Sequence, residues 1–127
     1  MILSDTDCII DYLNGKAPED GPIVKSLLDG TLAISPVVAF ELYYGHPSGP
    51  RRDELDELLA VIKVLPLTQE AAEFAGLEGA RLQAEGMKLA APDLLIAGTA
   101  LEHNLSLVTR NIRHFDRIRG LRLERPD

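Results

Sequence analysis

Short apolar segments alternate with longer segments of helical periodicity along the whole chain, and this alternation restricts the folds that the chain can adopt. We expect strands at residues 2–4, 32–35, 62–67, 105–109 and 121–123. We expect two helices that end near residues 15 and 30, three that cover 36–45, 53–61 and 68–86, and one that begins at residue 92. Strands joined through helices need crossover connections, which favour parallel pairing with both faces of the sheet covered. The sequence therefore predicts a three-layer α/β/α fold, with a mainly parallel central sheet of four or five strands.

The size and cysteine content of the chain indicate one ordinary globular domain. It has 127 residues, of which 46% are hydrophobic, so we expect a single domain over residues 1–127. The one cysteine, Cys8, cannot form an intramolecular disulfide, and its apolar segment predicts a core residue rather than a nucleophile. The N-terminus lacks the positive charge of a signal peptide, and no segment approaches the roughly 18 apolar residues of a membrane helix. We therefore expect a cytoplasmic protein without membrane contact.

Charge is unevenly distributed along the chain. The formal net charge is −7, which argues against a protein that coats nucleic acid in general. Residues 110–127 nevertheless contain six arginines against three acidic residues. A basic segment on an acidic body can bring a phosphate backbone to one edge of the molecule, or it can dock an acidic partner. The sequence leaves both interpretations open.

The segment 36–45 is apolar around its whole circumference, with Glu41 as its only charge. Phe40, Tyr43 and Tyr44 supply three of the six aromatic residues in the chain. A helix of this kind is buried on all sides or meets a partner. We expect one face to lie in the core and the other to form an oligomer or partner contact, as in a homodimer.

Acidic residues lie close to three of the expected strands. Asp5 directly follows the first strand, Glu41 lies about one and a half turns into the helix after the second, and Asp93 begins the helix before the fourth. Asp5 also suits a helix N-cap, and Asp93 also suits a helix start. Glu41 has no Lys or Arg nearby in the sequence, and burying it unpaired would cost several kcal/mol. Since ligands of open parallel sheets bind at the carboxyl ends of strands, we expect the three carboxylates to converge.

Three converging carboxylates repel one another unless they are protonated or bridged by a cation. Oxygen ligands without a Cys or His cluster select Mg²⁺, or Mn²⁺, over Zn²⁺. The three histidines have no metal-binding spacing, and the chain has no Walker P-loop, no G-x-G-x-x-G and no G-x-S-x-G. The residues alone therefore favour an acidic Mg²⁺ site for phosphodiester hydrolysis.

Four segments resemble the sequence signatures of PIN-domain proteins, in the same order and spacing. They are Leu3-Ser4-Asp5-Thr6-Asp7, the segment from Ser35 to Gly45, Pro92-Asp93-Leu94-Leu95-Ile96-Ala97, and the run from Leu107 to Leu121 that contains Thr109-Arg110-Asn111 and His114-Phe115-Asp116. Together they span nearly the whole chain, and they are most similar to the VapC-type toxins of bacterial and archaeal toxin–antitoxin pairs. The resemblance implies a Mg²⁺-dependent endoribonuclease that a VapB-type antitoxin holds inactive.

The resemblance also implies roles for individual residues. Asp5 and Asp93 would be metal ligands, and Glu41 would complete the acidic triad, directly or through water. Thr6 and Thr109 would orient carboxylates or waters by hydrogen bonds. The reaction that fits is in-line attack of water on a phosphodiester, with the metal ion stabilising the charge that develops on oxygen.

The fourth acidic position of the family is not matched. Asn111 stands where many PIN domains have Asp, so both the fourth ligand, Asn111 or Asp116, and the choice between one and two metal ions stay open. Arg110 or Arg113 would neutralise substrate phosphates, which the acidic body otherwise repels. RNA rather than DNA as the substrate rests on the resemblance alone.

Two other classes of protein remain as alternatives. A phosphoacceptor receiver domain has a similar length and acids after its first strand, but it needs an Asp at the end of the central strand and a Lys after a late one. Here residues 62–67 contain no Asp, and Thr109 is followed by Arg110. A catalytically silent interaction module would carry the acids as remnants. A nuclease assay on RNA and DNA, with and without chelator, separates both alternatives from a nuclease.

Overall fold

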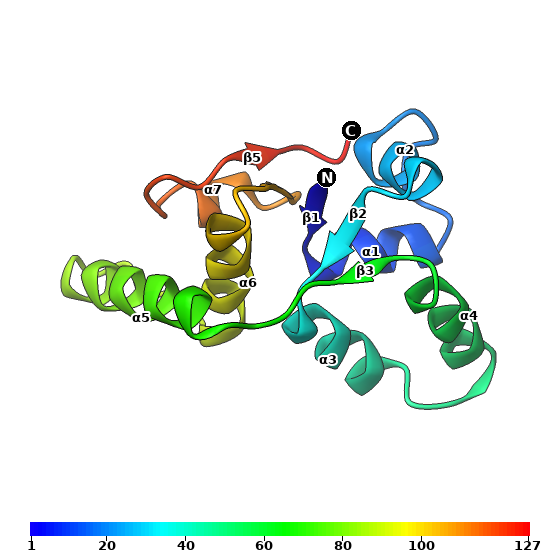
Figure 1. The fold of residues 1–127 in the computed structure, drawn as a ribbon, viewed down its shortest axis with the longest axis horizontal. Coiled ribbons are helices and arrows are strands. Elements are labelled where there is room, and N and C mark those ends of the chain that lie inside the picture. Colours follow the sequence, from blue (N-terminus) through cyan, green and yellow to red (C-terminus); the bar gives the residue numbers. More distant parts are fainter.

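A computed structural model describes residues 1–127 and contains five strands and seven helices (Figure 1). The strands are β1 (Ile2–Ser4), β2 (Leu32–Ile34), β3 (Lys63–Val64), β4 (Ser106–Val108) and β5 (Leu123–Glu124). The helices are α1 (Thr6–Leu13), α2 (Pro22–Asp29), α3 (Pro36–Gly45), α4 (Gly49–Leu59), α5 (Gln69–Ala84), α6 (Ala91–Glu102) and α7 (Ile112–Phe115). The expected α/β fold with a central sheet of four or five strands is confirmed, and the sheet has five.

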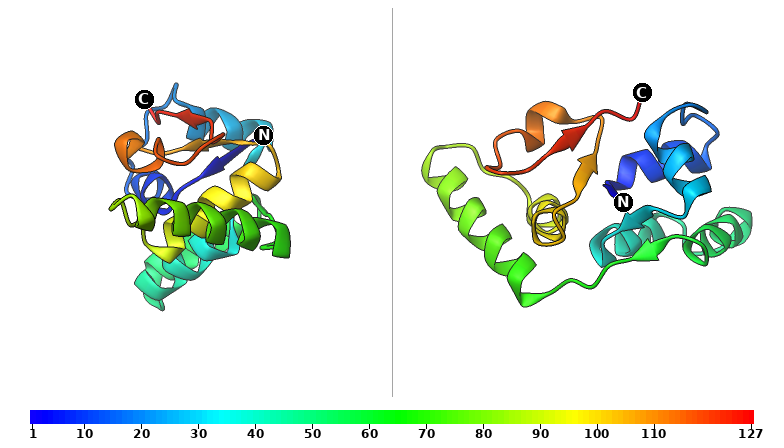
Figure 2. Two further views of the ribbon diagram at one scale, coloured as in Figure 1. Left: turned by 90° about the vertical axis from the view of Figure 1, so that its left-hand side faces the viewer. Right: turned by 45° about the horizontal axis from the view of Figure 1, so that its top comes forward.

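The sheet is entirely parallel, in the order β3-β2-β1-β4-β5. In the centre, Leu3 of β1 pairs with Ala33 of β2 on one side and with Leu107 of β4 on the other. The chain moves outward from β1 to β3, then returns to β4 and β5 beyond β1. Because crossovers between parallel strands are right-handed, this reversal places α1–α4 and α5–α7 on opposite faces (Figure 2). The carboxyl ends of β1, β2 and β4 therefore flank the point where ligands of such sheets bind.

Local sequence signals explain most of the helix boundaries. Ser35 caps α3 by accepting two backbone N–H groups, and Thr68 caps α5 in the same manner with one. Gly30 ends α2 in the left-handed conformation, with φ of 72°, which a residue with a side chain adopts at a cost. The helix expected over 53–61 begins earlier, at Gly49, because Pro50 fits the first helical turn instead of preventing it.

Three short elements differ from their expected form. The strand expected over 62–67 pairs only over Lys63 and Val64, since it lies at the edge of the sheet and has a single neighbour. The last strand covers Leu123 and Glu124 instead of 121–123. The one-turn helix α7 was not expected, since four residues are too few to show helical periodicity. Phe115, which is 2% exposed, attaches α7 to the core.

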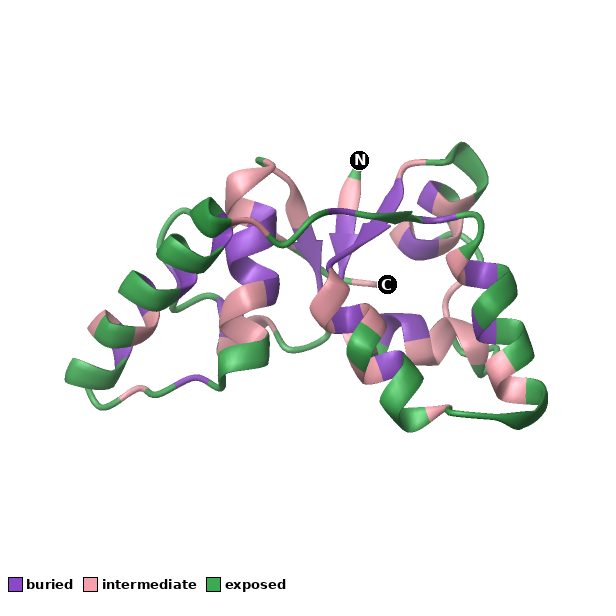
Figure 3. Ribbon diagram, turned by 60° about the horizontal axis from the view of Figure 1, so that its bottom comes forward, coloured by how far each residue is buried: buried purple, intermediate pink, exposed green.

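The core surrounds the central strands, and the purple segments of Figure 3 mark it. α3 contributes Val38 and Leu42, which are fully buried. Its other face is open to solvent, with Phe40 64% and Tyr44 80% exposed. The expected division of α3 into a core face and an outer aromatic face is therefore confirmed, and the partner contact remains a prediction. None of the helices combines the length and apolar character needed to span a membrane.

Candidate active site

An acidic hollow of about 160 Å³ lies at the carboxyl end of β1, where the strand order reverses. The residues that line it are Asp5, Thr6, Asp7, Glu41, Asp93 and Ile96. They come from the start of α1, the middle of α3 and the beginning of α6. No Lys or Arg lines the hollow, so its charged side chains are all carboxylates. The structure thus brings the three expected acidic residues to one place and adds Asp7 to them.

Asp5 is fixed by hydrogen bonds on both carboxylate oxygens. It is the N-cap residue of α1, and its Oδ1 accepts the backbone N–H of Cys8 at 3.0 Å. Thr109, directly after β4, donates from its hydroxyl to Oδ2 at 2.6 Å. The backbone N–H of Asn111 donates in turn to Thr109 Oγ1 at 3.0 Å. Asp5 therefore serves as a helix cap and still presents its carboxylate to the hollow, so the two interpretations of this residue are compatible.

Burial raises the pKa of the Asp5 carboxyl above its ordinary value, and the negative charge of Asp7 adds to the rise. Hydrogen bonds from Thr109 and Cys8 act in the opposite direction, because they stabilise the ionised form. Repulsion among Asp5, Glu41 and Asp93, which the sequence led us to expect, would also raise the pKa of a carboxyl in this hollow. The direction agrees, but the main cause is the loss of water around Asp5, and the contributing charge is that of Asp7.

Glu41 is held by Thr6 across the contact between α1 and α3. The Thr6 hydroxyl donates to Glu41 Oε1 at 2.5 Å, which gives this threonine the orienting position expected for it. Thr6 is an uncharged donor, so it fixes the carboxylate without neutralising it. Glu41 has no cationic partner in the structure, and the residue is half-buried.

Asp93 contacts a residue that the sequence argument did not place in the site. His114 of α7 lies with Nε2 2.8 Å from Asp93 Oδ2. The two residues are 21 positions apart, and α7 is needed to bring them together. The one signal in the sequence was the position of His114 in the fourth PIN-like segment, and His spacing alone gave no reason to select it.

The donor chemistry of the hollow suits a hard divalent cation, because every polar side-chain group that lines it is an oxygen ligand. In the present conformation, no three His, Cys, Asp or Glu side chains lie close enough together to hold one metal ion. Hydrogen bonds instead hold Asp5, Glu41 and Asp93 separately, as expected for like charges that no cation bridges. The residues fit Mg²⁺ by type and location, and their side chains would have to converge on it.

The other expected site residues lie outside the acidic hollow. Asn111 and Asp116 are exposed at the two ends of α7, and neither lines the hollow. Arg113 is exposed on the same helix. Arg110 forms an ion pair with Asp11, with 2.9 Å between Arg110 Nε and Asp11 Oδ2.

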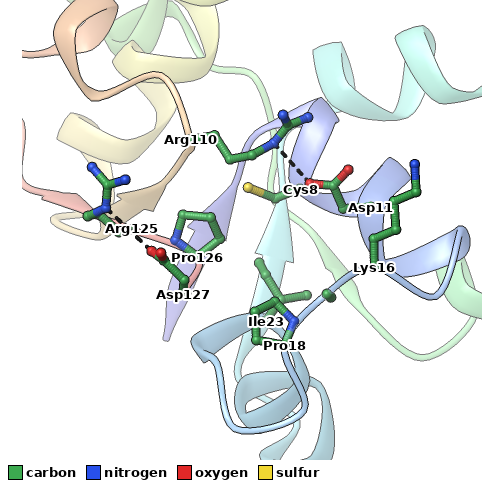
Figure 4. A pocket seen from close by; sticks show the side chains of 10 residues that line it. Cys8, Asp11, Lys16, Pro18, Ile23, Arg110, Arg125, Pro126 and Asp127 are labelled. Atoms are coloured by element: carbon green, nitrogen blue, oxygen red, sulfur yellow. Dashed lines mark hydrogen bonds and ion pairs between the residues drawn. The ribbon is translucent and has the colours of Figure 1, made fainter.

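Arg110 lines a separate cavity of about 250 Å³ between α1 and the C-terminal residues, shown in Figure 4. Cys8 also lines this cavity, although only 1% of the residue is exposed. Burial raises the pKa of the Cys8 thiol, so the thiolate is disfavoured at neutral pH. The prediction that Cys8 is a core residue is therefore confirmed.

Comparison with known proteins assigns the chain to a protein family. The family model of the PIN domain matches residues 2–121. The chain belongs to the PIN domain family. It is 38% identical to ribonuclease VapC10 of Mycobacterium tuberculosis over 115 residues, which cover 91% of this chain and 86% of the relative. It is 33% identical to the tRNA(fMet)-specific endonuclease VapC of Salmonella typhimurium, with 98% and 96% covered.

Solved structures agree with this assignment to the PIN domain family. The VapBC2 complex of Rickettsia felis, bound to a DNA fragment from its promoter, contains a chain that superposes with a TM-score of 0.85. The two chains are 30% identical, and all of each is covered. The resemblance to VapC-type PIN domains that the four sequence segments indicate is therefore confirmed.

Proposed function

We propose that this chain is a VapC-type endoribonuclease toxin, formed by a single PIN domain over residues 1–127, that hydrolyses RNA phosphodiester bonds with the help of Mg²⁺ or Mn²⁺. Asp5, Glu41 and Asp93 are the residues that would hold the ion. The observation that carries the proposal is the acidic hollow at the reversal point of the sheet, which four carboxylates line without a Lys or Arg. The VapC nucleases among the relatives support RNA as the substrate.

In the hollow, the carboxylates would bind the ion, and hydroxyl and backbone groups orient the carboxylates. A bound Mg²⁺ supplies a Lewis acid that activates water and offsets the negative charge on the phosphate. Asp5 is immobilised by its two hydrogen bonds, and Thr6 fixes the direction of Glu41. The backbone N–H of Asn111 donates to Thr109 Oγ1 and so helps to hold Asp5 in place. This role does not require the amide side chain of Asn111 to bind the ion.

We expect further contacts of the substrate, and the contact of the partner, to lie outside the hollow. RNA phosphates would meet the basic segment, where Arg113 is exposed and Arg110 would exchange its ion pair with Asp11 for a phosphate. A VapB-type antitoxin would hold the toxin inactive, which the VapBC complexes among the structural neighbours support. The exposed aromatic face of α3 is a candidate surface for this antitoxin or for a homodimer.

We expect RNA cleavage to stop when EDTA removes divalent cations, and to return when Mg²⁺ or Mn²⁺ is added in excess. The physical reason is that carboxylates without a cation repel a phosphodiester and supply no Lewis acid. The measurement follows cleavage of labelled single-stranded RNA, with DNA of the same sequence in parallel.

Four outcomes would contradict this proposal. Cleavage that survives EDTA, or that only Zn²⁺ restores, would exclude the Mg²⁺ site. Cleavage of DNA in preference to RNA would exclude the ribonuclease. No cleavage of either under any metal condition, from a folded protein free of antitoxin, would favour the silent interaction module.

A further inference from the structure

We infer that His114 is a positioning residue, whose imidazole anchors one oxygen of the Asp93 carboxylate at the hollow and leaves the other oxygen to meet the metal ion. The inference rests on the proposed function, and it assigns to α7 a direct part in building the site. His114 does not line the acidic hollow, so its effect passes through Asp93.

The contact between the two residues has the geometry of a strong hydrogen bond. Nε2 lies 2.8 Å from Oδ2, and an ionised carboxylate can only accept, so Nε2 carries the proton. The bond engages one oxygen of Asp93 and leaves Oδ1 available to a cation. His114 provides the only hydrogen bond to the Asp93 carboxylate, which lies in the first turn of α6.

The imidazole is itself held in place by its neighbours. Its ring packs edge-on against Phe115, with 5.2 Å between the ring centroids and 90° between the planes. Phe115 is buried, and the backbone N–H of His114 donates to the carbonyl of Asn111 at 3.1 Å. Because the buried Phe115 holds the His114 ring in place, this ring can set the direction of the Asp93 carboxylate, which is itself partly exposed.

The same segment orients a second carboxylate of the hollow. Thr109 donates to Asp5, and five residues later His114 donates to Asp93. The run that follows β4 therefore positions two of the three proposed ligands, while Thr6 positions the third, Glu41. Groups that hydrogen-bond to a ligating carboxylate fix its orientation, and replacing them commonly lowers metal affinity 10–100-fold.

Three substitutions distinguish the effect of the His114 hydrogen bond from two other effects, the loss of ring shape and the loss of any imidazole from the chain. His114→Phe keeps a ring of similar size without the N–H. His114→Gln offers an amide N–H at a similar distance along the side chain. His46→Phe removes an imidazole that bonds to the carbonyl of Leu42, away from the hollow.

Thermal unfolding of EDTA-treated protein is followed while Mg²⁺ is titrated, and cleavage of RNA is measured over the same range. We expect His114→Phe to raise the Mg²⁺ concentration that gives half of the maximal thermal stabilisation by about tenfold or more. We expect His114→Gln to recover most of this loss and His46→Phe to match the wild type. The KM for RNA at saturating Mg²⁺ should be unchanged, because His114 does not touch the substrate.

Each contrary outcome has a distinct meaning. Equal Mg²⁺ titrations for His114→Phe and the wild type overturn the inference and leave the proposed function intact. A His114→Phe variant with normal Mg²⁺ affinity but a lost kcat also overturns it, because His114 would then act on the reacting atoms. His114→Gln that behaves like His114→Phe shows that the hydrogen bond is not the cause. A wild type that does not respond to Mg²⁺ overturns the proposed metal site and this inference together.

Discussion

Replacement of Glu41 by glutamine is expected to lower the rate of RNA cleavage about a thousandfold or more, with the fold intact. The change removes one negative charge and keeps the shape and the oxygen that accepts from Thr6. Loss of a carboxylate that holds the ion removes several kcal/mol of charge stabilisation in the transition state, and about 1.4 kcal/mol corresponds to tenfold in rate. The measurement is the initial cleavage rate at saturating Mg²⁺, with thermal unfolding as the check on folding.

Glu73→Gln is the matched control for this prediction. Glu73 is exposed on α5 and does not line the hollow, so the same change of chemistry there should leave cleavage unaltered. A Glu41→Gln variant that cleaves within about threefold of the wild type would contradict the role proposed for Glu41.

Asp5→Asn is expected to abolish cleavage and yet to stabilise the metal-free protein at pH 7. Burial raises the folded-state pKa of Asp5, so the folded state binds this proton more tightly than the unfolded state does. The favourable contribution of that proton is complete below the unfolded pKa of about 4, and it is lost as the pH rises through the folded pKa. At pH 7 the wild type therefore holds a buried charge, which asparagine does not have.

The structure also shows why asparagine should be tolerated at this position. Its Oδ1 can accept from the backbone of Cys8 as a helix N-cap, and its amide can donate to the hydroxyl oxygen of Thr109. Urea unfolding of both proteins in EDTA, at pH 7 and at pH 4, measures the difference. The advantage of the variant should shrink towards pH 4, because the wild-type carboxyl becomes protonated.

Mg²⁺ should reverse the order of stability. An ion that binds only the folded state stabilises it by mass action, so saturating Mg²⁺ should raise the midpoint of the wild type far more than that of Asp5→Asn. A variant that is less stable than the metal-free wild type at pH 7 would contradict the cost assigned to the buried charge. A variant that keeps its activity and its response to Mg²⁺ would remove Asp5 from the proposed site.

The sequence predicted the sheet and the position of the acidic residues because both depend on short-range patterns. Apolar strands followed by helices imply parallel pairing, and the acid that follows a central strand must then lie at its carboxyl end. This reason applies to Asp5, whereas Glu41 and Asp93 were expected beside it from their positions in helices next to the central strands, and all three line the hollow. The four PIN-like segments carried the family assignment, which the match over 2–121 confirms.

Other features depend on packing that periodicity does not encode. The single turn of α7 has no repeat to detect, and its formation relies on the burial of Phe115. The partnership of His114 with Asp93 follows from that turn. The expectation that Arg110 or Arg113 meets substrate phosphates stays a prediction, but the sequence did not show the ion pair of Arg110 with Asp11 on α1, which joins segments far apart in the sequence. The sequence also did not show that hydrogen bonds hold the carboxylates separately.

A crystal structure of the protein soaked in Mn²⁺, with anomalous scattering measured at the manganese edge, tests the central claim most directly. Mn²⁺ replaces Mg²⁺ at oxygen ligands and identifies itself by its anomalous signal. We expect a peak in the hollow with carboxylate oxygens of Asp5 and Asp93 at about 2.1 Å, and with Glu41 bound directly or through one water. A hollow that stays without a peak while Mn²⁺ binds elsewhere on the chain would contradict the proposal that these carboxylates form one metal site.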